Sequence, residues 1–261
     1  MMAPRGYQTL IVTEGSGVVT VTLNRPDRRN ALSAAMVNEL LYVIGDANGD
    51  PDTRVIVLQG AGPVFCAGGD FSQMSGAEDG ALALRGDFAD LLLAMMRTTR
   101  PIVARVHGHA MGGGLGLVAA ATYAFAASEA QLGTPEVHVG IFPMMIMAVL
   151  ARLVPRRRLT EMMLSGERMN ADHAASIGLI NRAVPAADLD ATVAATVQML
   201  VARSPAAIRL GLDAFVAQDD LALAEALPML RERLAGVLTT DDAREGLTAF
   251  LEKRKPVWTG K

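Results

Sequence analysis

The 261-residue sequence has a single cysteine, Cys66, and only three lysines, all within its last nine residues. One cysteine excludes an intramolecular disulfide and a zinc site built on pairs of cysteines. The formal net charge is −3, so the chain has no broad positive field for the phosphate backbone of a nucleic acid. We therefore expect neither a nucleic-acid partner nor a metal site.

Long segments without charged residues are also scarce, and the longest of them has an unusual composition. Residues 106–128 contain no Asp, Glu, Lys or Arg, which is long enough to cross a bilayer. Five glycines and two histidines within them instead favour a buried strand, a glycine loop and a buried helix, so we expect no membrane partner. The N-terminus lacks the pattern of a signal peptide. Arginine replaces lysine almost throughout, as GC-rich coding DNA would produce, and we expect a cytoplasmic bacterial protein.

Hydrophobic residues make up 51% of the chain, enough for a substantial core. Short apolar runs typical of strands alternate with segments of helical periodicity. This alternation predicts an α/β fold with parallel strands. A hairpin turns at residues 15–17, and Ser33 is placed to cap a helix. Further strands are expected at 55–58, 101–106, 123–127 and 130–133, with helices at 81–96 and 115–121. Strand signals stop near residue 144, which predicts a helical C-terminal third.

Two glycine-rich loops each follow a buried strand and lead towards a helix: CAGGD at residues 66–70 and MGGG at 111–114. Backbone N–H groups at such places lack partners, and glycine lets a ligand approach them closely. If the loops converge, two N–H groups could hold one developing oxyanion. The alternative is that these glycines only permit tight turns.

A carboxylate follows in the segment LGTPEV at residues 132–137. Glu136 lies between apolar residues, and burial would raise its pKa and suit it to general acid–base chemistry. The alternative is a glutamate at a helix start, stabilised by the helix dipole.

Other patterns carry less weight. GLGLVA at residues 114–119, with Glu129 beyond it, resembles a dinucleotide-binding fingerprint, but its helix is too short and its spacing is wrong. His107 and His109 have no cluster of metal ligands around them, and we expect structural roles. Cys66 is expected to be a small buried hydrophobe. The apolar segment at 143–147 could line an acyl pocket or belong to the core.

Six segments together identify a family. NRPDRRNAL, FCAGGDF, HGHAMGGGLG, GTPEVHVGIFP, LSGERMNADHAASIGLINRAVP and AFLEKRKPVWTGK occur in this order along nearly the whole chain. The sequence thereby resembles the crotonase (enoyl-CoA hydratase/isomerase) superfamily. The resemblance implies an α/β fold, a crotonase-like spiral of ββα units over residues 1–200. It also implies a C-terminal helical trimerisation region over 201–261, a homotrimer or hexamer, and an acyl-CoA thioester as ligand.

The resemblance also implies roles for individual residues. The N–H groups of Gly69 and Gly113 would bind the thioester oxygen of an enolate, and Glu136 would be the acid/base. Coenzyme A is then part of the substrate, and no separate cofactor is expected. The residues expected to bind substrate are Arg28, Arg29, Ala31, Ala67, Asp70, Phe71, Met111 and Pro135, with Phe250 and Lys253 contributed by a neighbouring subunit.

The sequence departs from the family at Gly116, where hydratases carry a second glutamate on the helix after the triple glycine. A single carboxylate suits a 1,3-proton shift better than hydration, because hydration needs a water held and deprotonated. We therefore predict an enzyme that leans towards double-bond isomerisation, with neither His138 nor Asp70 assigned as an assistant. The alternative is a protein that binds CoA thioesters with weak or lost hydratase activity.

Overall fold

The computed structural model of the chain describes residues 5–70 and 82–261. Their largest sheet has six strands in the order β1-β2-β3-β4-β6-β9. Strands β1 and β2 form the expected antiparallel hairpin, and every other neighbouring pair in this sheet is parallel. The strands span Leu10–Gly15 (β1), Val18–Leu23 (β2), Val55–Gly60 (β3), Ile102–Val106 (β4), Tyr123–Ala127 (β6) and Arg182–Val184 (β9).

A second sheet has the order β5-β7-β8, formed by Ala110–Met111, Gln131–Gly133 and Arg168–Asn170. Strand β4 of the large sheet is followed by β5 of the small one and then by a helix. Strands β6 and β7 repeat this alternation before the next helix. This repeat is the expected spiral of ββα units, and it brings segments that follow successive strands to one region of the molecule.

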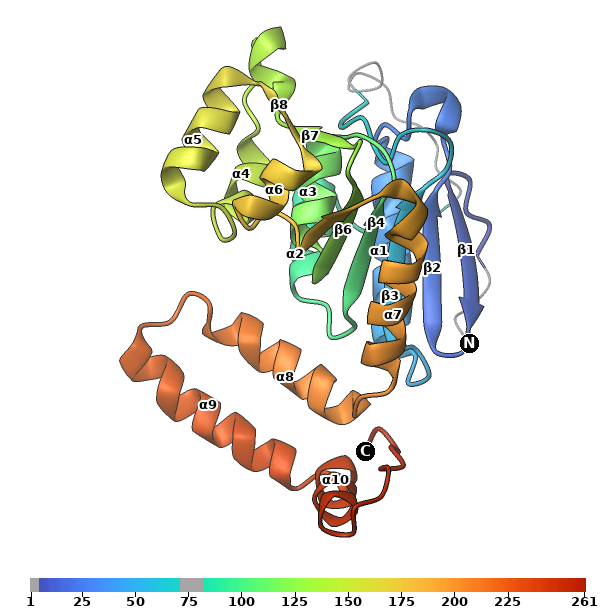
Figure 1. Ribbon diagram of the computed structural model, residues 1–261, viewed down its shortest axis with the longest axis vertical. Coiled ribbons are helices and arrows are strands. Elements are labelled where there is room, and N and C mark those ends of the chain that lie inside the picture. Colours follow the sequence, from blue (N-terminus) through green and yellow to red (C-terminus); the bar gives the residue numbers. More distant parts are fainter. Residues whose placement is uncertain (1–4, 71–81) are drawn as a thin grey trace.

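Helix α1 packs on one face of the large sheet and α7 on the other (Figure 1). Helix α1 begins after Ser33, whose side chain accepts from the Met36 N–H as expected. The α-helices span Ala34–Gly49 (α1), Phe88–Met96 (α2), Gly113–Ala120 (α3), Met144–Leu150 (α4), Arg156–Ser165 (α5), Ala171–Ser176 (α6), Leu189–Val201 (α7), Pro205–Gln218 (α8), Leu223–Leu238 (α9) and Asp241–Leu251 (α10). Short 3-10 helices span Pro26–Arg28 (η1), Pro135–Val139 (η3) and Ala186–Asp188 (η4).

Alternate residues of the large sheet enter two different cores. Ile56 and Leu58 of β3 face the main core with α1, whereas Val55 and Val57 face a smaller core with α7. Successive side chains of a strand point to opposite faces, so a strand covered on both sides is apolar throughout. This explains the continuous apolar run that predicted β3 from the sequence.

Two expectations about secondary structure were wrong. Strands β8 and β9 lie beyond residue 144, where none was expected, because each has three residues and too short a run for an alternating pattern. Helix α2 begins at Phe88 and not near residue 81. Asp87 caps it, accepting from the N–H groups of Ala89 and Asp90, while the Asp90 side chain accepts from the Asp87 N–H.

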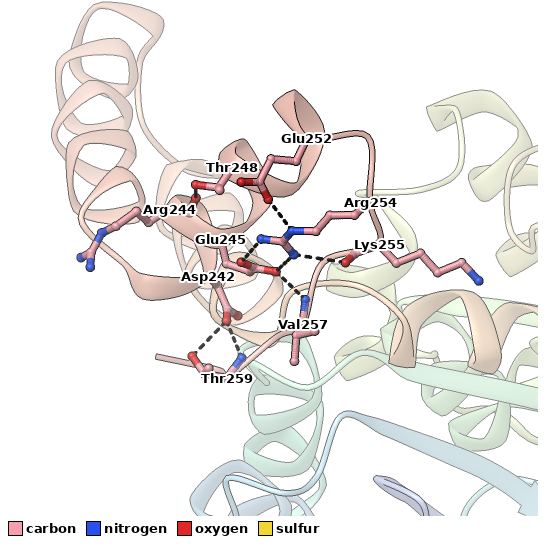
Figure 2. A network of polar contacts seen from close by, with 9 residues as sticks. All are labelled: Asp242, Arg244, Glu245, Thr248, Glu252, Arg254, Lys255, Val257 and Thr259. Carbon is pink, nitrogen blue, oxygen red and sulfur yellow. Dashed lines mark hydrogen bonds and ion pairs between the residues drawn. The ribbon is translucent and has the colours of Figure 1, made fainter.

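Helices α8 to α10 extend away from the sheets in the lower part of Figure 1. The division into residues 1–200 and 201–261 stays a prediction, although α7 ends at Val201. The C-terminal tail returns to this arm: Asp242 accepts from the Thr259 N–H, and Arg254 pairs with Glu245 (Figure 2). Asp242 also accepts from the Gly260 N–H. Arg254 lowers the pKa of Glu245 to about 2.

Within the described ranges, no single helix has the length and composition to cross a membrane. One bent pair, 186–201 with 205–218, meets the criterion by length and composition alone, with a bend of 101°. The same residues contain no cluster of three or more His, Cys, Asp or Glu side chains that could hold a metal ion.

Candidate active site

Backbone hydrogen bonds join the two glycine loops side by side. The Cys66 N–H donates to the His109 carbonyl (3.2 Å), and the Met111 N–H donates to the Cys66 carbonyl (3.0 Å). Together they pair the segment after β3 with strand β5. Residues further along each loop, Gly69 and Gly113, are thereby brought to the same place.

The geometry around Gly69 and Gly113 is tight. A Cβ added to Gly113 would lie 3.6 Å from the Gly69 nitrogen, and a Cβ added to Gly68 would lie 3.5 Å from the Gly113 nitrogen. Gly113 is the first residue of α3, so its N–H has no partner within the helix. Among the backbone hydrogen bonds outside regular elements that the described residues form, neither of these N–H groups is a donor. The two N–H groups therefore lie close together, each without an acceptor among these backbone bonds.

Gly69 obtains its position from a neighbouring loop. The Leu32 N–H donates to the Gly68 carbonyl (2.8 Å), and the Asp70 N–H donates to the Leu32 carbonyl (3.0 Å). Gly69 thus lies on an extended segment paired with Leu32. The helix start expected directly after Asp70 falls within residues 71–81, outside the described residues.

Glu136 lies beside this pair. It belongs to the first turn of η3, and the Gly112 N–H donates to the carbonyl of Gly133, which precedes η3 by two residues (2.9 Å). A Cβ added to Gly112 would lie 2.7 Å from Oε1 of Glu136. The carboxylate therefore touches the residue directly before the Gly113 donor.

The electrostatics of Glu136 suit acid–base chemistry. Its Oε2 atom is buried and has no hydrogen-bond partner among the described residues. Burial raises the pKa of the carboxyl above its ordinary value, because the charged form loses hydration. A carboxylate of this kind accepts a proton from a carbon acid more readily than a solvated one.

The space beside Gly116 is occupied by apolar side chains of two other helices. A Cβ added to Gly116 would lie 2.4 Å from Cγ2 of Ile146, on α4, and 3.3 Å from Cζ of Phe88, on α2. A second carboxylate could not stand at this position unless Ile146 shifted. Phe88 was not expected at the site, and Ile146 was considered only as part of the apolar segment at 143–147. The sequence gives no signal for the contact itself, since 116 and 146 are 30 positions apart.

The expected CoA-binding residues of the first loop are brought together. The Ala67 N–H donates to the Arg29 carbonyl (3.0 Å), which joins Arg28, Arg29 and Ala31 to the segment containing Ala67 and Asp70. Arg28 and Arg29 are exposed, so their guanidinium groups are accessible to an anionic ligand. Phe71 lies outside the described residues.

Two residues that the sequence did not single out hold this loop. Asn30 is fully buried; its Nδ2 donates to the carbonyls of Ala61 and Val64, and its Oδ1 accepts from the Arg25 N–H. The Arg25 guanidinium pairs with Asp70 at 3.0 Å. Asp70 is thus a partner of Arg25, which agrees with not assigning it as a catalytic assistant.

The remaining expected residues fall into two groups. Met111 ends β5 next to the glycines and is buried, and Pro135 is the first residue of η3. Phe250 lies in the last turn of α10 and Lys253 follows the helix by two residues; α10 is at the opposite end of the molecule from β7 and α3 (Figure 1). The chain's own copies of these two residues therefore do not reach its own site.

Several side chains have structural roles. His107 bonds through Nε2 to the Gly62 carbonyl, and Nδ1 of His109 accepts from the Gln131 N–H, as a structural role predicts. Nε2 of His138 bonds to the Ser165 carbonyl, which joins η3 to the end of α5. Cys66 is completely buried, and burial raises the pKa of its thiol to about 12, so it is no nucleophile.

The alternative of a dinucleotide-binding site is wrong, because the glycines of GLGLVA leave no room for a ligand. A Cβ added to Gly114 would lie 2.5 Å from the Cys66 carbonyl oxygen, and Gly116 is covered by Ile146. Protein atoms therefore fill the positions at which a pyrophosphate would approach these two glycines. In the apolar segment at 143–147, Ile146 belongs to the core, whereas Met144 is exposed. Lining of an acyl pocket by this segment stays a prediction.

The fold and the side-by-side glycine loops define the class of this α/β protein. The family model "Enoyl-CoA hydratase/isomerase" matches residues 13–261, and the chain belongs to this family. Its fold is the crotonase fold, as the resemblance implied.

Solved structures and curated relatives agree with this assignment. A Mycobacterium smegmatis enoyl-CoA hydratase is 36% identical with a TM-score of 0.90, covering 96% of this chain and 99% of that one. A Bacillus anthracis enoyl-CoA hydratase is 30% identical with a TM-score of 0.89, covering 97% and 100%. Human enoyl-CoA hydratase domain-containing protein 3, named as mitochondrial, is 34% identical over 93% of this chain and 81% of its own length.

Proposed function

We propose that this chain catalyses double-bond migration in an enoyl-CoA thioester, with Glu136 as its one acid/base. The observation that carries the proposal is the contact of the Glu136 carboxylate with Gly112, directly beside the N–H groups of Gly69 and Gly113. Coenzyme A enters as part of the substrate, and no other cofactor takes part.

The chemistry follows from charge. Removing a proton from the α-carbon of a 3-enoyl thioester moves negative charge onto the thioester oxygen. Each backbone donor aimed at that oxygen is worth roughly 3–4 kcal/mol in the transition state. Glu136 takes the proton from the α-carbon and returns it to the γ-carbon, so the double bond moves into conjugation and no atom is gained or lost.

Hydration makes a further demand that this site meets less well. A water has to be held and deprotonated while another proton reaches the α-carbon. Gly116 has no side chain, and of the two residues considered as assistants, Asp70 pairs with Arg25 and His138 bonds to Ser165. Among the described residues, Glu136 is the carboxylate that this comparison leaves for catalysis, and a single carboxylate favours migration. A protein that binds CoA thioesters with little turnover is the second candidate, and the apolar contact at Gly116 supports it.

The proposed assembly is a homotrimer or hexamer. Helices α8–α10 expose large apolar side chains, which a lone chain would leave in water. These residues are Phe215, Leu223, Leu227, Leu234, Leu238, Leu247, Phe250 and Leu251. In such an assembly, Phe250 and Lys253 of one copy would reach the CoA of another. We propose a bacterial cytoplasmic location, which the mitochondrial name of the human relative does not support.

The deciding experiment compares the wild type with Glu136→Gln on 2-enoyl-CoA and 3-enoyl-CoA, following water addition and double-bond migration separately. We expect the wild type to favour migration and Glu136→Gln to lose about 100-fold or more of it. Glu129→Gln changes an exposed carboxylate and is the matched control. Full turnover of both thioesters by Glu136→Gln would remove Glu136 from the mechanism. Tight binding of an acyl-CoA without turnover would favour the second candidate.

A further inference from the structure

One face of helix α3 is covered by two apolar side chains. Gly113 and Gly116 are three residues apart, so they lie on the same side of the helix. The Phe88 ring spans both: its Cζ would lie 3.4 Å from a Cβ on Gly113 and 3.3 Å from a Cβ on Gly116. Ile146 covers the second position more closely, at 2.4 Å. This face begins at the proposed oxyanion donor, so its covering borders the reacting atoms.

We propose that Ile146 and Phe88 are specificity-determining residues, which select double-bond migration over hydration by filling the place of a water-activating group. The proposal rests on the proposed function and extends it. It explains the absence of a second carboxylate by packing. The side chain of Ile146, on α4, occupies the space beside position 116 and is only 3% exposed.

The two reactions differ in their need for water at this face. Hydration forms a bond between a water oxygen and the β-carbon and delivers a proton to the α-carbon. A water in that place needs two or more polar partners. Among described residues, the side-chain atoms closest to positions 113 and 116 are carbons of Leu32, Phe88 and Ile146. Migration moves one proton between two carbons and needs no water, so an apolar wall leaves it intact.

The contact also explains why one substitution cannot restore the second acid. A real Cβ does not approach another atom to 2.4 Å, so even alanine at position 116 requires Ile146 to shift. Shortening Ile146 to alanine removes Cγ2 and leaves its Cβ, which is 3.3 Å away. Residues 116 and 146 should therefore behave as a coupled pair.

The first test measures the ratio of hydration to migration. Ile146→Ala should raise this ratio about tenfold, a change that corresponds to about 1.4 kcal/mol between the two barriers. Val149→Ala truncates another buried residue of α4 and should leave the ratio near the wild-type value. An unchanged ratio in a folded Ile146→Ala protein, or an equal rise in Val149→Ala, would overturn the proposal.

The second test adds the missing carboxylate. Gly116→Glu with Ile146→Gly should gain hydration of 2-enoyl-CoA over Ile146→Gly alone. Gly116→Glu in the wild-type background should lower the melting temperature without gaining hydration. A stable Gly116→Glu protein that hydrates as well as the double variant would contradict the role of Ile146.

A third measurement is independent of turnover. Gly116→Ala should lower the melting temperature of the wild type, although alanine is the better helix former. In the Ile146→Ala background it should be neutral or stabilising. If the wild type turned over neither thioester, the proposed function would fail. The melting temperatures of these four proteins would still test the contact between positions 116 and 146. Equal temperature shifts in both backgrounds would exclude the contact.

Discussion

Oε1 of Glu136 lies 2.7 Å from the point that a Cβ on Gly112 would occupy. Gly112 also has a φ of 51°, in the region that favours glycine. The carboxylate and the backbone before the Gly113 donor are therefore in contact only because residue 112 has no side chain. This relationship makes the glycine a positioning residue for the proposed base.

Gly112→Ala should displace the carboxylate and lower kcat/KM for migration about 100-fold, as a misplacement near 1 Å can do. Gly140→Ala is the matched control: Gly140 also has a positive φ (75°), but nothing lies within 4 Å of its added Cβ. It should show the backbone strain, about 1–2 kcal/mol, without the loss of rate. Equal losses of rate in the two folded variants would attribute the effect to strain.

The pH dependence of the rate should reflect the burial of Glu136, which raises its pKa above the ordinary 4.5. A base must be ionised to take a proton, so kcat/KM should fall on the acid side with a midpoint above 4.5. The measurement is kcat/KM for 3-enoyl-CoA against pH, which reports the pKa of the free enzyme. A midpoint at or below 4.5 would speak against Glu136 as the base.

The same shift predicts how the stability of Glu136→Gln compares with the wild type. The unfolded chain loses the Glu136 proton near 4.5 and the folded chain at a higher pH, so the wild type loses stability as pH rises through this window. Glutamine carries no charge. Glu136→Gln should therefore be more stable than the wild type at about pH 7 and have no advantage at about pH 3, both by urea unfolding. The opposite order at neutral pH would show that the carboxylate is stabilised in the fold.

Asp242 joins the C-terminal tail to the helical arm. It is 1% exposed and accepts from Ser204 and from the N–H groups of Ala206, Thr259 and Gly260. Asp242→Ala should cost about 3 kcal/mol of unfolding free energy, because several buried donors lose a charged acceptor. Asp241→Ala, next to it and exposed, should change stability by less than about 0.5 kcal/mol.

The pKa of Asp242 adds a pH signature. Burial alone would raise this pKa, but the hydrogen bonds from Ser204, Thr259, Gly260 and Ala206 outweigh it and lower the pKa below 3.8. The stabilisation is therefore present above 3.8 and is lost as pH falls through the lower folded value. The gap between the wild type and Asp242→Ala should close in acid, and a gap independent of pH would contradict this account.

The apolar arm should control assembly. Leu247 and Leu251 are one turn apart on α10 and are 60% and 79% exposed. Replacing both with glutamate should convert a trimer or hexamer into a smaller species, measured by light scattering, and should weaken acyl-CoA binding. Thr248→Glu adds charge to the same helix at an exposed polar position and should leave the mass unchanged. A wild type that is already monomeric would exclude the proposed assembly.

Local chemistry was readable from the chain in several places. The hairpin, the Ser33 cap and strand β3 follow from residue type and spacing, since turns, caps and buried strands depend on near neighbours in sequence. Strands β8 and β9 could not be found this way, because a three-residue strand is stabilised by its partners. Asn30 was missed for the same reason: its importance lies in the carbonyls of Ala61 and Val64.

Residue order alone specified the family, the two glycine loops and the single glutamate after Pro135, because short motifs retain their chemistry wherever the chain goes. The convergence of Gly69, Gly113 and Glu136 depended on the pairing of segments more than 20 residues apart. The filling of position 116 by Ile146 depended on the packing of α4 against α3. Contacts of this kind are properties of three-dimensional packing, in which a difference of one side chain decides whether a polar group or an apolar one borders the site.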